Sequence, residues 1–510
     1  MRILFSSVLY SCAYACLFGS YALAIDTPIT KETNQPASPS LSSEEVQSSH
    51  SISINGVTIP YTATAGKLTL QDEKDQAKAH IFYVAYTKSS DQNLSERPIT
   101  FCFNGGPGSS SVWLHMGAFG PQTVMCNDRG LPVIPYSTKV NESSLLDLTD
   151  LVFIDPVATG LSTATTGQDP KEFFTLDSDI ESIAEFIRLY VTKNGRWRSP
   201  KLLAGESYGT TRAAGLASYL QDNLFMSLDG ILLISSVLDW QTLSLSSRYS
   251  GNDLACALSL PSFAAAAWFH KKANTKLSLD QFLSEVNIFA TTEYTLALMQ
   301  GCKIDPTKKE QIIQKLMGYT GLSKEFIERC DMRFNVSSFS KELLRSSSEL
   351  IGRFDARIKG YDLIPCSGTA SYDPSIEQLM LAYTSLFNDY LKTELAFKTD
   401  REYKILVDVF PWDFKHGSNL HLNLALDLHD TMTQNPSLQV FVASGLFDLA
   451  TPYLATEYTI EHMQLNPALQ KNVVSKFYPG GHMMYLDQAN LKALKVDLNS
   501  FYKQLRQTPK

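Results

Sequence analysis

KLLAGESYG, residues 201–209, is the stretch that decides the fold of this chain. A short apolar run ends at Ala204, the pattern G-x-S-x-G occupies 205–209, and a helical run rich in Ala and Leu follows. Strand, G-x-S-x-G turn and helix in this order are typical of a nucleophile elbow, which exposes the serine hydroxyl at a helix N-terminus. The bare pattern also occurs by accident, but with these flanks it predicts that Ser207 is a nucleophile.

Short apolar runs recur along the chain and predict the sheet around this turn. Each is bounded by Gly, Pro or Asp, which suits strands buried on both faces of a parallel sheet. These runs are 99–103, 151–154, 202–204 and 231–234, and the sheet pattern resumes at 438–443 and 473–478. Between them the capping box Ser178-x-x-Glu181 indicates a helix start, and residues 51–88 read as antiparallel strands. The alternation of strand and helix predicts an α/β fold with a mostly parallel sheet.

One long segment, residues 243–415, departs from this rhythm. It contains helical patterns, among them the capping box Ser278-x-x-Gln281 and the run 375–397, without clear strands. Because the segment is too long for a loop, we expect a helical subdomain inserted into the sheet. The sheet domain is then split into residues 51–242 and residues 416–510, with the helical cap between them.

The composition is that of a large globular protein. Of the 510 residues, 44% are hydrophobic and 19% are charged, so the chain can bury a core and is not mainly disordered. The 52 acidic residues exceed the 44 basic ones, for a net charge of −8. This excess argues against nucleic acid as a partner, because nucleic-acid binding normally needs a basic face, and also against anionic membrane surfaces. An enzyme is the class that remains.

The first 24 residues are typical of an export signal. Arg2 is their only charge, an apolar stretch runs from Ile3 to Leu23, and the last three residues, Ala-Leu-Ala, fit the small-x-small cleavage rule. An uncleaved membrane anchor is the alternative, which Ser, Cys, Tyr and Gly in the stretch disfavour. We therefore expect removal of residues 1–24, a disordered linker over 25–50, and a periplasmic or secreted protein without stable membrane association.

Six cysteines remain once Cys12 and Cys16 leave with the signal. An even number in an exported chain allows up to three disulfides, with fifteen possible connectivities. Closeness in sequence suggests the pairs Cys102–Cys126 and Cys302–Cys330. No C-x-x-C occurs, so neither a zinc knuckle nor a thioredoxin-like motif is expected.

A serine nucleophile needs a base and an acid that orients the base. Asp448 follows the apolar run 438–443, and His482 follows the run 473–478 after Gly-Gly. The chain order Ser, Asp, His is the order of the α/β-hydrolase arrangement. Both residues lie where strands are predicted to end, at the edge of a parallel sheet where active sites assemble. A lone His in such a loop could simply face solvent, but three residues in order at three strand ends predict a catalytic triad.

A glycine-rich loop, NGGPGSSS at 104–111, follows the first of these buried runs. On its own it could be a turn or a phosphate cradle. It lacks the Lys of a phosphate-binding loop, which disfavours phosphate. In a serine hydrolase a loop at this position supplies a backbone N–H to the oxyanion hole.

These motifs together resemble the serine carboxypeptidases, over roughly residues 98–502. The motifs that carry the resemblance are NGGPGSS at 104–110, GESYG at 205–209, GLFD at 445–448 and GGHM at 480–483. The resemblance implies an α/β-hydrolase fold with a cap, with Ser207 as nucleophile, His482 as base and Asp448 as its orienter. It also implies site residues beyond the triad: backbone N–H groups of Gly106 and Tyr208 at the oxyanion, and Asn104, Gly105 and Glu206 at the substrate's C-terminal carboxylate.

The carboxylate-binding role of Glu206 has a physical consequence. An ionised Glu206 repels a carboxylate at hydrogen-bond distance, so it must be protonated to donate a hydrogen bond. We therefore expect cleavage of free-acid substrates to be favoured at acidic pH. The alternative is that Glu206 is a structural residue of the turn.

One position departs from the family pattern. In better-known members a second glutamate precedes the Gly-Pro that ends the first motif and shares a proton with the elbow glutamate; here that position is Ala118, in MGAFGP at 116–121. Without a paired acid, we expect a shifted pH preference and a weaker carboxylate pocket. The version with Ala resembles bacterial branches of the family.

The sequence thus predicts an exported serine-type carboxypeptidase that acts on peptides with a free C-terminus. Esterase or acyltransferase activity with the same triad is an alternative, and an inactive hydrolase-fold binding protein is another. No cofactor and no metal are expected, since His416, His421 and His429 lack metal-ligand spacing. Trp113 and His115 could line the specificity pocket, and core packing is an equal alternative for Trp113.

Overall fold

The structure is a computed structural model that describes residues 45–89, 93–243, 251–417 and 421–507. The predicted signal at 1–24 lies outside the described residues, as does the predicted linker up to residue 44. The end of that linker needs correction, because residues 45–50 form the start of strand β1. Pairing with the next strand holds this polar segment in place, and the ring of His50 stacks on Tyr61 with centroids 5.4 Å apart.

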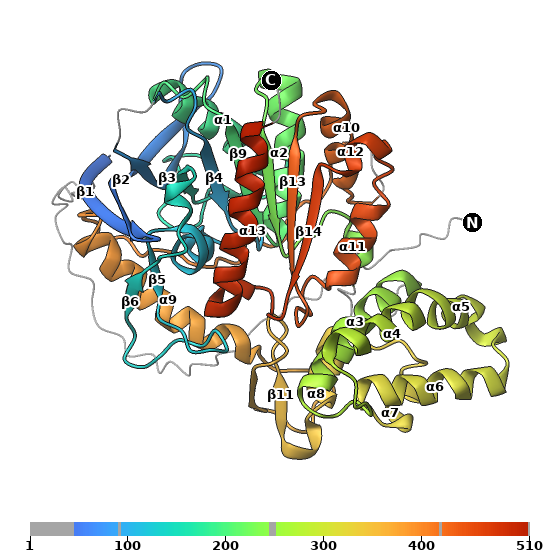
Figure 1. Ribbon diagram of the computed structural model, residues 1–510. Coiled ribbons are helices and arrows are strands. Elements are labelled where there is room, and N and C mark those ends of the chain that lie inside the picture. Colours follow the sequence, from blue (N-terminus) through green and yellow to red (C-terminus); the bar gives the residue numbers. More distant parts are fainter. Residues whose placement is uncertain (1–44, 90–92, 244–250, 418–420, 508–510) are drawn as a thin grey trace, which may run out of the picture. The chain divides into compact units, whose positions relative to one another are not determined.

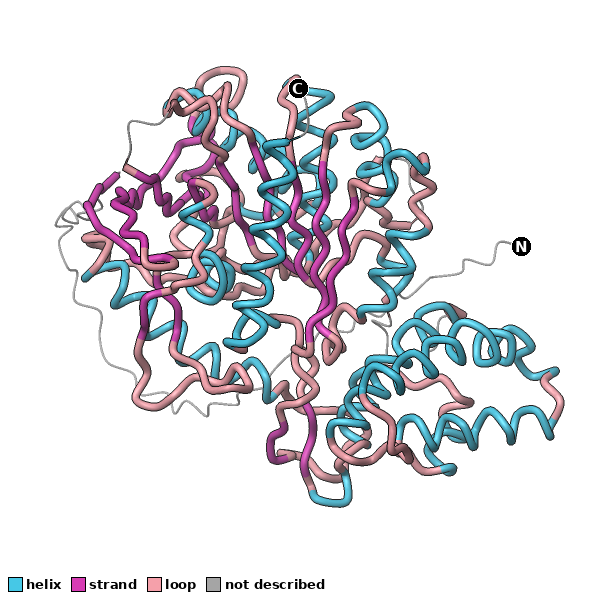
Figure 2. Tube along the Cα trace, in the orientation of Figure 1, coloured by secondary structure: helices cyan, strands magenta, loops and turns pink. Residues whose placement is uncertain are grey.

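A ten-stranded mixed sheet forms the centre of the fold (Figures 1 and 2), with the path β1-β2-β3-β7-β4-β9-β10-β13-β14 and β8 paired to β3. Its strands are β1 (Glu45–Ile54), β2 (Val57–Gln71), β3 (Ala77–Lys88), β4 (Ile99–Phe103), β7 (Asp150–Ile154), β8 (Thr163–Ala164), β9 (Lys201–Glu206), β10 (Gly230–Ile234), β13 (Gln439–Gly445) and β14 (Val473–Tyr478). From β7 to β14 all neighbours are parallel, whereas β1, β2, β3 and β7 pair antiparallel. The predicted mostly parallel sheet is confirmed.

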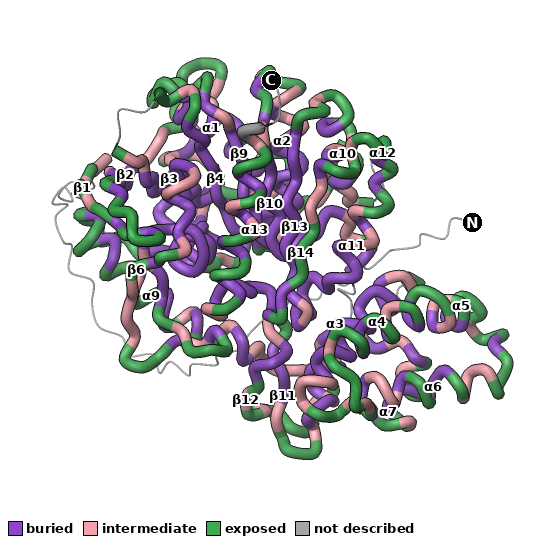
Figure 3. The backbone as a smooth tube through the Cα atoms, in the orientation of Figure 1, coloured by how far each residue is buried: buried purple, intermediate pink, exposed green. Residues whose placement is uncertain are grey.

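The central strands are buried on both faces, as their uninterrupted apolar runs predict (Figure 3). In β4, Phe101 and Phe103 point into one hydrophobic cluster and Cys102 into the other. Helices α1 (Leu176–Lys193), α2 (Tyr208–Leu224) and α10 (Ala425–Gln434) pack on the first face, and α13 (Gln488–Gln507) packs on the second.

Helix α1 begins earlier than its predicted capping box. Thr175 is the N-cap, and its side chain accepts a hydrogen bond from the Ser178 backbone N–H at 3.0 Å. The box pattern at Ser178 therefore lies inside the first turn. Either residue can cap a helix, and burial of Leu176 against the sheet favours the earlier start.

The inserted segment has a hydrophobic cluster of its own. It contains α3 (Asp253–Phe269), α4 (Leu279–Phe289), α5 (Thr295–Gln300), α6 (Pro306–Thr320), α7 (Lys324–Arg329), α8 (Val336–Glu342) and the hairpin of β11 (Glu349–Ile351) and β12 (Lys359–Tyr361). Ser278 caps α4 as predicted. Residues 256–356 share one cluster with the start of α11 (Tyr453–Glu461), whereas α9 (Pro374–Thr393) packs with the sheet. Packing therefore divides the predicted 243–415 insertion into a helical part and a part that joins the sheet domain.

The remaining α-helix is α12 (Pro467–Gln470). The remaining strands are β5 (Gln122–Val124) and β6 (Thr138–Val140), which pair as a hairpin. The predicted disulfides are absent from the described residues, where all six cysteines are free thiols. Cys102 lies inside the sheet, fully buried, while Cys126 is half-buried and pairs with Pro132 in an isolated β-bridge. Among the described helices, none is long and apolar enough to cross a bilayer.

Candidate active site

Ser207 sits in a tight turn between the end of β9 and the start of α2. Its φ of 60° is in the left-handed region, which is strained for a serine. The turn is closed so tightly that a Cβ on Gly205 would lie 2.1 Å from the carbonyl oxygen of Gly209. The Ser207 N–H donates to the carbonyl of Ile234 at 3.0 Å, which ties the turn to the end of β10. The geometry is that of the predicted elbow, with a half-buried serine at a helix N-terminus.

Asp448 and His482 form a fully buried pair at the ends of β13 and β14. His482 Nδ1 and Asp448 Oδ2 are 2.7 Å apart. The other carboxylate oxygen accepts from the backbone N–H groups of Ala450 and Thr451 at 2.7 and 3.0 Å. The Thr451 hydroxyl donates to Asp448 Oδ2 at 2.6 Å. These donors hold the side chain of Asp448 in one orientation.

His482 is fixed from its backbone as well as from its ring. Its N–H donates to the carbonyl of Phe354 at 2.6 Å, and its own carbonyl accepts from the Ser235 hydroxyl at 2.5 Å. Ser235 directly follows Ile234, the residue that holds Ser207, so the end of β10 positions both residues. His482 Nε2 is buried and accepts no hydrogen bond from any described residue. That nitrogen is available to take a proton.

Burial lowers the pKa of His482, but the carboxylate of Asp448 outweighs it by charge and by its hydrogen bond, so the pKa is raised overall. Ionised Glu206 also raises this pKa, and Arg353 lowers it. With Nδ1–H directed to Asp448, the hydrogen-bond network assigns the lone pair to Nε2. This is the tautomer that a general base requires.

The glycine-rich loop touches the elbow through its backbone. A Cβ on Gly105 would lie 2.5 Å from the backbone nitrogen of Tyr208, so no larger residue fits there. The N–H groups of Gly106 and Tyr208 donate to no other described residue. The carbonyl of Asn104 accepts from Arg212 at 2.6 Å, and Arg212 forms a buried ion pair with Asp179. Two unused donors therefore lie on two backbone segments that are in contact.

Glu206 is buried beside this loop. Its Oε2 accepts from the Tyr485 hydroxyl at 2.5 Å and from Asn104 Nδ2 at 3.1 Å. Asn104 is oriented by Leu114, whose N–H donates to its Oδ1 at 3.1 Å. Burial raises the pKa of Glu206 to about 7; His482, Tyr485 and Asn104 lower it and Asp448 adds to the rise. The carboxyl can therefore carry a proton near neutral pH.

Sequence reasoning missed two residues of this arrangement. Tyr485 lies three residues after His482, in the single 3₁₀ turn Met484–Leu486, and Thr451 lies three residues after Asp448. Closeness to a triad residue in sequence is the only signal that either one gives. Ala118, in the buried π-helical turn Leu114–Phe119, brings no acid to the site.

His115 belongs to the core and not to a pocket. It is buried, its ring stacks on Phe153 with centroids 4.3 Å apart, and its Nε2 lies 2.6 Å from the Tyr86 hydroxyl. Burial lowers its pKa to about 3. Trp113 packs against Tyr383, at 4.6 Å between ring centroids. The suggestion that His115 lines a specificity pocket is therefore wrong.

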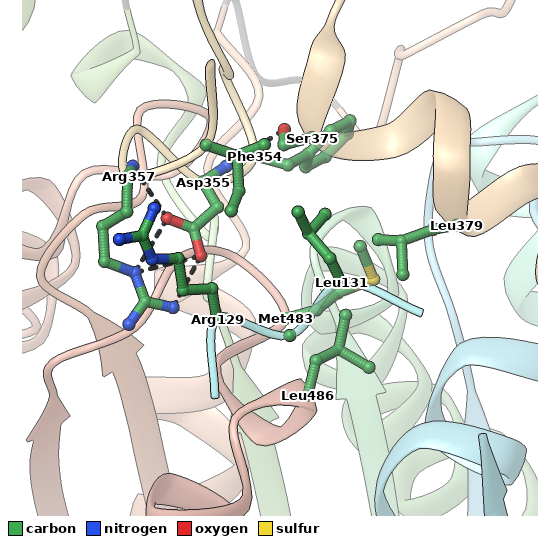
Figure 4. A pocket seen from close by; sticks show the side chains of 11 residues that line it. Arg129, Leu131, Phe354, Asp355, Arg357, Ser375, Leu379, Met483 and Leu486 are labelled. Atoms are coloured by element: carbon green, nitrogen blue, oxygen red, sulfur yellow. Dashed lines mark hydrogen bonds and ion pairs between the residues drawn. The ribbon is translucent and has the colours of Figure 1, made fainter. Parts of the chain in front are cut away.

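A small pocket lies beside the catalytic loop (Figure 4). It is lined mainly by Arg129, Leu131, Phe354, Arg357, Met483 and Leu486. Its free volume of about 20 Å³ has room for little more than a water molecule. In this conformation the pocket does not admit an amino-acid side chain.

His416 lies away from these residues, between Asp177 at 2.6 Å and Asp427 at 2.9 Å. Its hydrogen bond to Asp427 is the main cause that raises its pKa to about 9. The described residues contain no group of three or more His, Cys, Asp or Glu side chains that could hold a metal ion.

Comparison with known proteins agrees with this geometry. The family described as serine carboxypeptidases matches residues 57–497, and the chain belongs to that family. The pheromone-processing carboxypeptidase KEX1 of Saccharomyces cerevisiae is 28% identical over 167 residues, which is 31% of this chain and 22% of that protein. The retinoid-inducible serine carboxypeptidase of Mus musculus is 26% identical over 201 residues, 36% of this chain and 41% of that one.

A solved structure supports the fold. The crystal structure of the prohormone-processing carboxypeptidase Kex1(Δ)p from Saccharomyces cerevisiae matches with a TM-score of 0.56 and 17% identity, and covers 87% of this chain and 92% of that chain. The α/β-hydrolase fold that the combined motifs predict is thereby confirmed. The sequence matches above cover 22% and 41% of those two relatives' lengths, well under two thirds of each.

Proposed function

We propose that this protein is a serine-type carboxypeptidase that removes C-terminal amino acids from peptides. The observation that carries the proposal is that the end of β10 holds both a strained Ser207 and the His482 of a buried Asp448–His482 pair, with the protonatable Glu206 next to the serine in sequence. Membership of the serine carboxypeptidase family supports it. No step of the reaction needs a cofactor or a metal.

The reaction proceeds through an acyl-enzyme. Ser207 Oγ attacks the carbonyl carbon of the last peptide bond while His482 Nε2 takes its proton, and Asp448 stabilises the imidazolium. The N–H groups of Gly106 and Tyr208 stabilise the oxyanion. His482 then protonates the leaving amine, and the C-terminal amino acid departs. Water, activated by His482, attacks the ester on Ser207 and releases the shortened peptide.

The substrate's free carboxylate is recognised by Asn104, the N–H of Gly105 and neutral Glu206. Neutral Glu206 donates a hydrogen bond, whereas ionised Glu206 repels the carboxylate. Because its pKa is about 7, binding of free-acid substrates weakens as the pH rises through that value. An ester or an amide at the C-terminus carries no charge, so its cleavage does not depend on this proton.

The protonation states of Glu206 and His482 are linked. Ionised Glu206 is one of the groups that raise the pKa of His482, so protonating Glu206 favours the neutral imidazole. The state that cleaves a free acid needs the proton on Glu206 and none on His482 Nε2. The pH profile for free acids is therefore bell-shaped, with an acidic limb from His482 and an alkaline limb from Glu206.

We also propose that the protein is exported. The support is the pattern of residues 1–24 in the sequence, and the family match that begins only at residue 57.

Peptides with a free C-terminus are its substrates. The helical insertion limits access so that chain ends reach Ser207 and internal peptide bonds do not.

A label and an assay test this proposal together. A serine-directed fluorophosphonate should modify Ser207 in the wild type, located by peptide mass spectrometry, and leave Ser207→Ala unmodified. Wild-type protein should release the C-terminal amino acid from an N-blocked dipeptide, and Ser207→Ala should not. Labelling without any release would favour an esterase, and no labelling would favour an inactive binding protein.

A further inference from the structure

We propose that Tyr485 is a positioning residue for Glu206. Its hydroxyl and the amide of Asn104 both donate hydrogen bonds to Oε2 of Glu206. The acid proton of Glu206 is thereby directed to Oε1, toward the substrate's carboxylate. This inference rests on the proposed carboxypeptidase function. In a site where Ala118 supplies no second carboxyl, Tyr485 holds the side chain of Glu206 in place.

The hydrogen bonds to Glu206 are asymmetric. Oε2 accepts both from Tyr485 at 2.5 Å and from Asn104 at 3.1 Å. Oε1 has no hydrogen bond to any described residue, and it is not among the fully enclosed polar atoms without a partner. An oxygen that already accepts two hydrogen bonds cannot also carry the acid proton without displacing a donor. Neutral Glu206 therefore carries its proton on Oε1.

Tyr485 remains a donor throughout the working range. Burial, followed by the charge of Glu206, raises the pKa of its phenol well above the usual value. The phenol therefore does not ionise where Glu206 titrates. The other donor, Asn104, is fixed in orientation because its Oδ1 accepts from the N–H of Leu114. Asn104 can therefore only donate to Oε2, and the Tyr485 hydroxyl keeps its proton and donates to the same oxygen.

The position of Tyr485 is dictated by tight packing. Its side chain is fully buried, and a Cβ on Gly117 would lie 2.7 Å from Tyr485 Cε2 and 2.8 Å from the hydroxyl of Tyr383. Gly117 therefore lets the turn Leu114–Phe119 approach both tyrosines. Since Tyr485 follows His482 by three residues, one loop carries both the catalytic base and the residue that hydrogen-bonds to Glu206.

Several groups besides Tyr485 act on Glu206. His482 and Asn104 lower its pKa, and Asp448 raises it. Tyr383 lies near enough that the charge of Glu206 helps to raise the pKa of its phenol. The hydroxyl of Tyr383 is buried and has no hydrogen-bond partner among the described residues. Tyr383 therefore provides a matched control: a buried phenol close by that makes no bond to Glu206.

The experiment compares Tyr485→Phe with Tyr383→Phe in the full chain. For each, kcat and KM are measured across the pH range on an N-blocked dipeptide acid and on its methyl ester. In Tyr485→Phe the ionised form of Glu206 loses a donor, so the alkaline limb for the acid should move to higher pH. At pH well below that limb, KM for the acid should rise about 2- to 10-fold, the effect of one neutral hydrogen bond. The ester profile should not move.

Tyr383→Phe should leave the alkaline limb where it is in the wild type. An unmoved limb in Tyr485→Phe, or equal losses on acid and ester, would overturn the inference. If Tyr485→Phe does not fold, 3-fluorotyrosine at position 485 serves instead. Its more acidic phenol is a stronger donor and should move the limb to lower pH, and no movement overturns the inference. A wild type that cleaves the ester but no free acid would instead defeat the proposed function.

Discussion

The sheet domain and the helical part of the insertion differ in how their buried polar groups are arranged. At the strand ends the sheet domain encloses charged and polar groups, among them the Arg212–Asp179 ion pair and Glu206. The insertion also buries one ion pair, Lys341–Asp362, but its cluster is built around aromatic rings such as Phe263 and Phe339, 4.3 Å apart. Buried polar groups must be paired at fixed distances, whereas an apolar cluster needs only volume. The polar groups of the proposed active site therefore lie in the sheet domain.

The largest effect is expected at the buried acid of the sheet domain. Asp448→Asn keeps the shape of the side chain but no longer holds His482 in the tautomer that a base needs, so kcat should fall about 10⁴-fold on acids and esters alike. The thermal midpoint should change little. A fall of less than about tenfold would mean that the Asp448–His482 contact does not serve catalysis.

A core substitution in the insertion should act on stability and not on chemistry. Phe339 is fully buried, and Phe339→Ala should destabilise the insertion by about 3–5 kcal/mol. Two buried thiols report where the loss falls: Cys256 lies in the cluster of the insertion and Cys102 in the sheet. A thiol reagent should then modify Cys256 faster and Cys102 at the wild-type rate.

Phe339→Leu, which keeps most of the volume, is the control for this variant. Ester hydrolysis should survive in both. Equal acceleration at Cys256 and Cys102 would contradict the comparison, because the two regions would then unfold as one cooperative unit.

Two glycine substitutions sharpen the contrast. A methyl group on Gly105 meets the Tyr208 nitrogen at 2.5 Å, so Gly105→Ala should displace an oxyanion donor and lower kcat about 10²–10³-fold. Gly318 in α6 has nothing within 4 Å of that position, and Gly318→Ala should leave kcat unchanged and raise stability slightly. Steady-state kinetics and urea unfolding of both proteins measure this. Similar losses of kcat in the two variants would contradict it.

The sequence predicted the sheet domain well because its signals are local. The runs 99–103 and 473–478 are strands with those very limits, and the first is apolar throughout. The order Ser207, Asp448, His482 follows from where strands end. These features need no knowledge of which segments meet in space.

Features that depend on packing between distant segments were not predictable. The contact of Tyr485 with Glu206 joins residues 279 positions apart, and no pattern in either stretch of sequence predicts it. The division of the 243–415 segment arises because α9 buries Phe387 and Tyr390 against the sheet domain, although its helical pattern resembles that of its neighbours. The disulfide prediction was wrong because cysteine count and spacing carry no information about burial in a strand.

The central claim is that the buried, protonatable side chain of Glu206 binds the free carboxylate of the substrate. The most direct test is the ratio of kcat/KM for an N-blocked dipeptide acid to that for its methyl ester, measured from about pH 5 to pH 8.5. In the wild type this ratio should be constant at low pH and fall about tenfold per pH unit above the Glu206 pKa of about 7. In Glu206→Gln, which donates a hydrogen bond at every pH, the ratio should be flat. Parallel profiles for acid and ester in the wild type, or a decline that persists in Glu206→Gln, would contradict the account.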